Sequence, residues 1–311
     1  MKNTLYLLSI LLVLGCSRVP EINAYVPPKQ KTKVVYQEKI VYRGSGKASN
    51  EETRDAYSHS ATQFNFKKNN KINDDAFALI IGINEYKNNT NVEYADYSAL
   101  AFEKLAQTTL GVPKENIITL LNSDASSGQI KAKIAQIRDL PGEGGVIYLF
   151  YAGHGVPAKD GKVYMLPADM SADSIDLEPN LQLDKIYKNL TKSEASNIFI
   201  FMDSCFSGKD GKGKLLYKGV APVLRTSKTE IRNKRLTVMT AGSNSDFAND
   251  FKAQEQRLFS YYLIQALSQG NNNLADVYKK IRKQVKRASI RKGIGYKQVP
   301  QIYGNSNKKL Y

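Results

Sequence analysis

The 311-residue sequence has few of the residues that build covalent or metal cross-links. Its only cysteines are Cys16 and Cys205, and its only histidines are His59 and His154. These four residues show no zinc-ligand spacing, and the chain has no aromatic-basic motif for single-stranded nucleic acid. Both absences argue against nucleic acid as a partner, although the formal charge is +16. Hydrophobic residues make up 42% of the chain, which is enough for a substantial core.

The first apolar run, residues 5–14, is too short for a transmembrane helix, which needs about 20 residues. Its place at the N-terminus predicts a signal peptide over residues 1–15. The run ends in Val13-Leu14-Gly15-Cys16, which resembles a bacterial lipobox. The resemblance implies that Cys16 is lipidated and holds the protein in the bacterial cell envelope, with Ser17 favouring the outer over the inner membrane. An ordinary secretory signal with an incidental cysteine is the alternative.

Lipidation of Cys16 leaves Cys205 as the only free thiol of the mature chain, so no intramolecular disulfide can form. A lone thiol in an exported protein points to chemistry rather than to structure. Residues 16–74 are rich in polar side chains and proline, and they predict a flexible tether between the membrane and a folded domain.

Continuous apolar runs typical of strands buried on both faces alternate with helical patterns in the rest of the chain. The expected strands are 76–83, 116–121, 145–151, 198–202, 236–241 and a last short one in 298–303, with a hairpin piece at 163–167. The expected helices are 96–110, 126–140, 181–190, 258–267 and 274–285. This rhythm predicts an α/β fold with helices on both faces of the sheet.

A reactive pair follows two of these strands. The strand at 145–151 runs into Gly153-His154-Gly155, and the strand at 198–202 runs into Asp203-Ser204-Cys205. Sites in open α/β sheets form beyond the carboxyl ends of the strands, so the imidazole and the thiol are expected to meet there. A neighbouring imidazole increases the thiolate fraction at neutral pH and then protonates the leaving amine. The backbone amides of Gly155 and Cys205 are candidates for an oxyanion hole.

Tyr151-Ala152-Gly153-His154-Gly155 and Asp203-Ser204-Cys205-Phe206-Ser207-Gly208 resemble the two catalytic motifs of the caspase-like peptidases, closest to the metacaspase branch. The separation of 51 residues between His154 and Cys205 agrees with the caspase pattern. The resemblance implies a caspase-hemoglobinase-like three-layer sandwich with a mostly parallel sheet. It also implies a large catalytic part (75–206), a basic interdomain loop (207–234) and a small part (235–311).

The metacaspase resemblance also implies cleavage of protein or peptide substrates after Arg or Lys. Two acidic side chains, Asp96 and Asp203, match the positions that would bind such a cation. The alternatives are a helix N-cap for Asp96 and a strand-end hydrogen-bond acceptor for Asp203. Phe206 departs from the metacaspase pattern, where histidine is common. A calcium cofactor stays open, because the aspartates that might bind it show no ligand spacing: Asp160, Asp169, Asp173, Asp176 and Asp184.

Two other functions compete with a peptidase. One is a catalytically idle caspase-like module that binds partners at the envelope. The other is a surface-binding lipoprotein that acts through the basic segment 271–311, which holds eleven Lys or Arg and one acidic residue, Asp276. The sequence does not define an oligomeric state.

Overall fold

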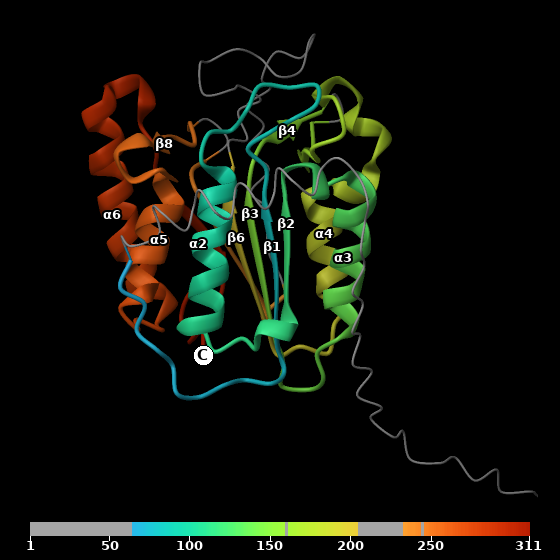
Figure 1. Ribbon diagram of the computed structural model, residues 1–311, viewed down its shortest axis with the longest axis vertical. Helices are drawn as coiled ribbons and strands as arrows, with labels where there is room; N and C mark the ends of the chain where they lie inside the picture. The colour runs from blue at the N-terminus through green and yellow to red at the C-terminus, as the bar shows by residue number, and fades with distance from the viewer. Residues whose placement is uncertain (1–63, 159–160, 205–232, 244–245) are drawn as a thin grey trace, which may run out of the picture. The chain divides into compact units, whose positions relative to one another are not determined.

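A six-stranded sheet in the order β10-β7-β6-β3-β1-β2 organises the fold (Figure 1). The computed structural model describes residues 64–158, 161–204, 233–243 and 246–311. All neighbouring strands in this sheet are parallel except β10, which pairs antiparallel with β7. The strands are β1 (Ala76–Gly82), β2 (Ile117–Leu121), β3 (Val146–Ala152), β6 (Asn197–Asp203), β7 (Leu236–Thr240) and β10 (Gln301–Gly304).

Helices cover both faces of the sheet, as Figure 1 shows edge-on. One face carries α2 (Ala95–Thr108), α5 (Leu258–Ser268) and α6 (Leu274–Lys292), and the other carries α3 (Ser127–Asp139) and α4 (Leu183–Leu190). The expected three-layer α/β sandwich with a mostly parallel sheet is therefore confirmed. Strands from before and after residue 235 complete the same sheet, since β7 pairs with β6.

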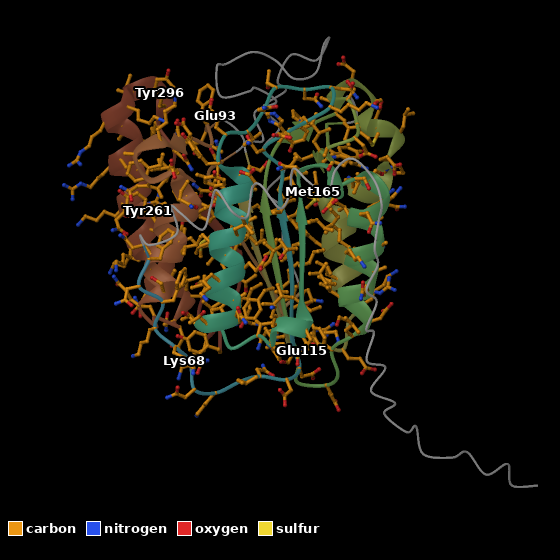
Figure 2. The ribbon with its side chains drawn as sticks, viewed as in Figure 1. Lys68, Glu93, Glu115, Met165, Tyr261 and Tyr296 are labelled. Carbon is orange, nitrogen blue, oxygen red and sulfur yellow. The ribbon has the colours of Figure 1, made fainter. Side chains whose placement is uncertain are left out.

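The central strands β3 and β6 are buried almost throughout, which explains their continuous apolar sequences. Phe102 on α2 stacks on Phe150 of β3, with 4.5 Å between the ring centroids. Figure 2 shows side chains filling the space between the sheet and the helices on each side. This packing holds the sheet as a rigid platform for whatever follows its strands.

Two short hairpins flank the carboxyl edge of the sheet. The first, β4 (Gly155–Pro157) with β5 (Val163–Met165), confirms the predicted hairpin piece and begins directly after His154. The second, β8 (Asp250–Phe251) with β9 (Gln256–Arg257), is not predicted by the sequence, because strands of two residues show no periodicity.

The described end of the predicted tether, residues 64–74, packs along the domain. Phe64 is buried, and the Lys67 backbone N–H donates to the carbonyl of Ser268 at the end of α5. The Thr109 hydroxyl donates to the carbonyl of Lys67 at 2.9 Å. These contacts tie the segment to α2 and α5. Residues 1–63, which include Cys16, lie outside the described residues, and in the described part no helix is long and apolar enough to cross a membrane.

Candidate active site

The carboxyl ends of β3 and β6 lie side by side. The two strands pair in parallel with Ala152 opposite Asp203, and the Gly153 N–H donates to the Asp203 carbonyl at 3.3 Å. His154 is the second residue after Ala152, and Cys205 is the second after Asp203. Cys205 and the loop up to residue 232 lie outside the described residues.

A backbone carbonyl holds the ring of His154. His154 is buried, with 4% of its surface exposed, and its Nε2 lies 2.7 Å from the Thr90 carbonyl oxygen. A carbonyl only accepts hydrogen bonds, so the contact assigns the proton to Nε2. In the neutral ring Nδ1 is then the basic nitrogen, which is the form that a general base requires.

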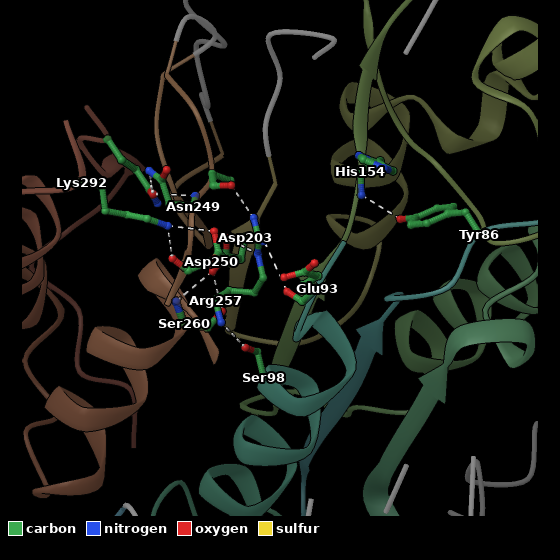
Figure 3. A network of polar contacts seen from close by, with 12 residues as sticks. Tyr86, Glu93, Ser98, His154, Asp203, Asn249, Asp250, Arg257, Ser260 and Lys292 are labelled. Carbon is green, nitrogen blue, oxygen red and sulfur yellow. Dashed lines mark hydrogen bonds and ion pairs between the residues drawn. The ribbon is translucent and has the colours of Figure 1, made fainter. Parts of the chain in front are cut away.

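Two buried tyrosines clamp the turn that carries His154. The His154 backbone N–H donates to the Tyr86 hydroxyl at 2.7 Å (Figure 3). The Tyr151 hydroxyl donates to the His154 carbonyl at 2.6 Å. The Tyr86 ring also packs on the imidazole, with 4.8 Å between centroids. Burial raises the pKa of both tyrosines well above the usual range, so both stay protonated as donors and acceptors.

Gly153 is required by this clamp. A Cβ at this position would stand 2.5 Å from the Tyr86 hydroxyl and 2.8 Å from the Tyr151 hydroxyl. Any larger residue would therefore push apart the two groups that hold His154 in place.

Replacing Tyr86 with phenylalanine is expected to leave the His154 N–H buried without an acceptor. The expected cost is about 1–3 kcal/mol of unfolding free energy and, through displacement of the imidazole, an activity loss on the order of tenfold. Thermal unfolding and peptide hydrolysis measure the two effects. The matched control is Tyr148→Phe, which removes another buried hydroxyl that bonds the Leu310 carbonyl. The control is expected to lose stability alone, and equal activity losses in both variants would contradict the positioning role of Tyr86.

Asp203 is completely buried at the end of β6. Its Oδ2 accepts hydrogen bonds from the backbone N–H and the hydroxyl of Ser260 at 2.9 and 2.7 Å. Ser260 lies in the first turn of α5, so the carboxylate stabilises the helix N-terminus. Asp203 thus accepts hydrogen bonds at the end of its strand, as the alternative reading of this residue expects. Burial raises the pKa of Asp203, while Arg257 and Ser260 oppose that rise.

Asp96 is also buried, at the start of α2. The N-cap of α2 is Tyr94, so the N-cap alternative for Asp96 is wrong, and Asp96 instead lies inside the first turn. Its Oδ2 accepts from the Asn122 side-chain amide at 3.3 Å, and its Oδ1 accepts from the Tyr97 N–H at 2.9 Å. Burial raises the pKa of Asp96, and these hydrogen bonds oppose the rise.

Within the described residues no hydrogen bond or ion pair joins Asp96 to Asp203, but both lie at the carboxyl edge of the sheet. Arg257 connects their elements: its backbone N–H donates to Ser98 on α2, and its side chain faces Asp203 (Figure 3). No sequence pattern predicts this role of Arg257, which directly precedes the apolar run of α5. Thr90 contacts His154 through its backbone carbonyl, which no sequence pattern reveals.

The remaining site predictions concern backbone amides and metal ions. Gly155 is buried as the first residue of β4, opposite Met165. Among the described residues there is no group of three or more His, Cys, Asp or Glu side chains that could hold a metal ion. Asp169, one of the aspartates considered for calcium, accepts from the Ser127 N–H at the start of α3.

Comparison with known proteins gives a family and a set of similar structures. Residues 75–311 match the caspase domain family. No curated protein matches the sequence. Among solved structures, protein GSU0716 from Geobacter sulfurreducens is 17% identical, with a TM-score of 0.49. The alignment covers 75% of this chain and 97% of the GSU0716 chain. Caspase-1 from Spodoptera frugiperda is 14% identical, with a TM-score of 0.48. The alignment covers 76% of this chain and 89% of the caspase-1 chain.

Proposed function

Because this chain belongs to the caspase domain family, we propose that it is a cysteine-type endopeptidase with His154 and Cys205 as its catalytic dyad. The observation that supports this most is the Nε2 contact of His154 with the Thr90 carbonyl, since it leaves Nδ1 as the base. The in-register pairing of β3 with β6 supports it further, because each reactive residue follows its strand at the same interval.

The proposed reaction has two steps. The Cys205 thiolate attacks the carbonyl carbon of the scissile peptide bond, and amides at Gly155 and Cys205 stabilise the oxyanion. The C–N bond breaks as the imidazolium of His154 gives its proton to the leaving amine. Water, deprotonated by the now neutral His154, then attacks the thioester; the C–S bond breaks, the acid product leaves, and the Cys205 thiolate and the His154 imidazolium are regenerated.

Covalent labelling tests the proposed activity. An arginyl acyloxymethyl ketone, which alkylates an activated thiolate, is expected to label Cys205 in the wild type and to give no adduct in Cys205→Ala. Mass spectrometry of the intact protein measures the adduct. Absence of label in the folded wild type, together with absence of hydrolysis across a peptide library, would favour the catalytically idle partner-binding module instead.

We also propose that the peptidase prefers Arg or Lys before the scissile bond. Asp96 and Asp203 are the acidic residues proposed to attract this cation. A positional-scanning peptide assay, run with and without calcium, is expected to show cleavage after Arg or Lys. Cleavage only after Asp would overturn this preference. A requirement for calcium would show that the protein uses an activating ion.

We also propose that the protein is anchored to the bacterial envelope through lipid on Cys16. Cys16→Ser is expected to move the protein from the membrane fraction to the soluble fraction, because one change removes both acyl attachment and processing. Fractionation followed by immunoblotting measures the shift, with Cys205→Ala as the control that keeps the other cysteine. A Cys16→Ser protein that stays in the membrane fraction would refute the anchor.

The basic segment after residue 270 supports a second candidate, binding to an anionic surface. Basic side chains of α6 are exposed on the outer side of the helix, while Val277, Ile281 and Val285 are buried against the core. Salt-sensitive binding to anionic vesicles that persists in Cys205→Ala would support this function beside or instead of peptidase activity.

A further inference from the structure

Arg257 is a buried cation that faces the carboxylate proposed to bind a basic substrate side chain. It ends β9, one residue before α5. Its side chain is 8% exposed and that of Asp203 is fully buried, and Arg257 Nε lies 3.9 Å from Asp203 Oδ1 (Figure 3). Arg257 therefore supplies, from within the chain, the charge that a substrate Arg or Lys would bring to Asp203.

Other contacts hold Arg257 in this place. Its Nη1 donates to the Glu93 carbonyl at 3.4 Å, and its Nη2 donates to the Ala248 carbonyl. Its backbone N–H donates to the Ser98 hydroxyl at 2.9 Å. The guanidinium is thus held by two backbone carbonyls, so its position does not depend on the carboxylate alone.

The ion pair between Arg257 and Asp203 is incomplete. The distance of 3.9 Å between Nε and Oδ1 is beyond hydrogen-bond length. Within the described residues, neither of these two buried atoms has a hydrogen-bond partner. Asp203 is consequently neutralised by Arg257 but keeps one free acceptor, an arrangement that strong bidentate arginine–carboxylate pairs do not show.

We infer that Arg257 is a specificity-determining residue of the proposed peptidase, and that it occupies Asp203 in place of a basic substrate side chain. The inference rests on the proposed function, in which Asp203 contributes to substrate recognition. A second cation placed beside Asp203 meets repulsion from Arg257 that offsets its attraction to the carboxylate. Arg257 thus weakens discrimination in favour of Arg or Lys, and its removal uncovers the acidic site.

Two peptides that differ only in charge measure this effect on catalysis. One carries Arg before the scissile bond, and the other carries citrulline, which has the same shape without the charge. In Arg257→Ala the ratio of kcat/KM for the Arg peptide over the citrulline peptide is expected to rise at least about tenfold above the wild-type ratio. An unchanged or lower ratio would overturn the inference.

A binding experiment tests the same inference without turnover. Agmatine, which reproduces the arginine side chain, is added to proteins that carry Cys205→Ala. At about 10 mM it is expected to raise the melting temperature of Arg257→Ala by roughly 3 °C, for a dissociation constant near 1 mM. The protein that retains Arg257 is expected to bind agmatine about tenfold more weakly and to shift by about 1 °C or less, relative to a salt control of equal ionic strength. This experiment measures binding and not cleavage. Its result can therefore be interpreted even if the protein has no peptidase activity.

The control for losing an arginine that bonds backbone carbonyls is Arg235→Ala, at a partly buried residue. The Arg235 guanidinium donates to the carbonyls of Thr191, Ser193 and Ala195, and the residue directly precedes β7, at the opposite edge of the sheet. It is expected to lose stability without an agmatine shift or a change in the peptide ratio. Arg257→Gln repeats both measurements if Arg257→Ala does not fold. Agmatine binding to the wild type that is as strong as to the variants would refute the inference, as would no binding to any folded Arg257 variant.

Discussion

Alanine at His154 is expected to lower kcat/KM toward peptide substrates by about 10³-fold, within the range typical of a lost general acid–base. His154 carries the only imidazole among the described residues, since His59, the other histidine of the chain, lies outside them. Its Nε2 contacts the Thr90 carbonyl, so in the proposed reaction the proton transfers fall to Nδ1.

Steady-state hydrolysis of a fluorogenic peptide measures this loss, and circular dichroism verifies that the variant folds. His59→Ala is the matched control and is expected to keep full activity. A His154→Ala protein that retains more than one tenth of the wild-type rate would show that His154 is not the catalytic base.

The second large effect is on stability. Asp203→Ala is expected to lower the unfolding free energy by about 3–5 kcal/mol, because it leaves the buried Arg257 without its counter-charge. The Ser260 N–H at the start of α5 also loses its acceptor. For a domain of this size the melting temperature should fall by roughly 10 °C.

Thermal unfolding measures this loss against two further variants. Asp203→Asn keeps an acceptor for Ser260 but not the charge, and an intermediate loss is expected. Asp139→Ala removes an exposed carboxylate paired with Arg138 and is expected to cost no more than about 1 kcal/mol. Equal losses in Asp203→Ala and Asp139→Ala would show that the buried pair contributes no more than a surface one.

The sequence predicts the central strands well because parallel strands covered on both faces need continuous apolar runs. The runs ending at Tyr151 and Met202 correspond to β3 and β6. The sequence underestimates α6, which was expected to end at 285 but continues to Lys292. Its buried stripe proceeds from Val285 to Ser289, and a buried serine carries no apolar signal.

Only part of the candidate site can be predicted from the sequence, because the residues that support it lie far apart along the chain. His154 stands out because histidine is rare and glycine flanks it on both sides. Tyr86 and Arg257 lie 68 residues before and 103 after it, and only the tertiary fold brings them to the same edge of the sheet. Side chains such as Tyr86, which position another residue, have no local sequence pattern. The residue that they position, here His154, does have one.

The pairing of β3 with β6 has a consequence for how this chain tolerates changes in length. Side chains alternate between the two faces of a strand, so one inserted residue turns everything beyond it to the opposite face. An insertion within β3 or β6 would therefore shift Ala152 relative to Asp203, which the register aligns, and with them the two residues proposed to form the catalytic dyad. The connection from Pro157 to Val163 bears no such restriction. Among related sequences, length should vary freely in the connections and stay constant between each strand and the residue proposed to react after it.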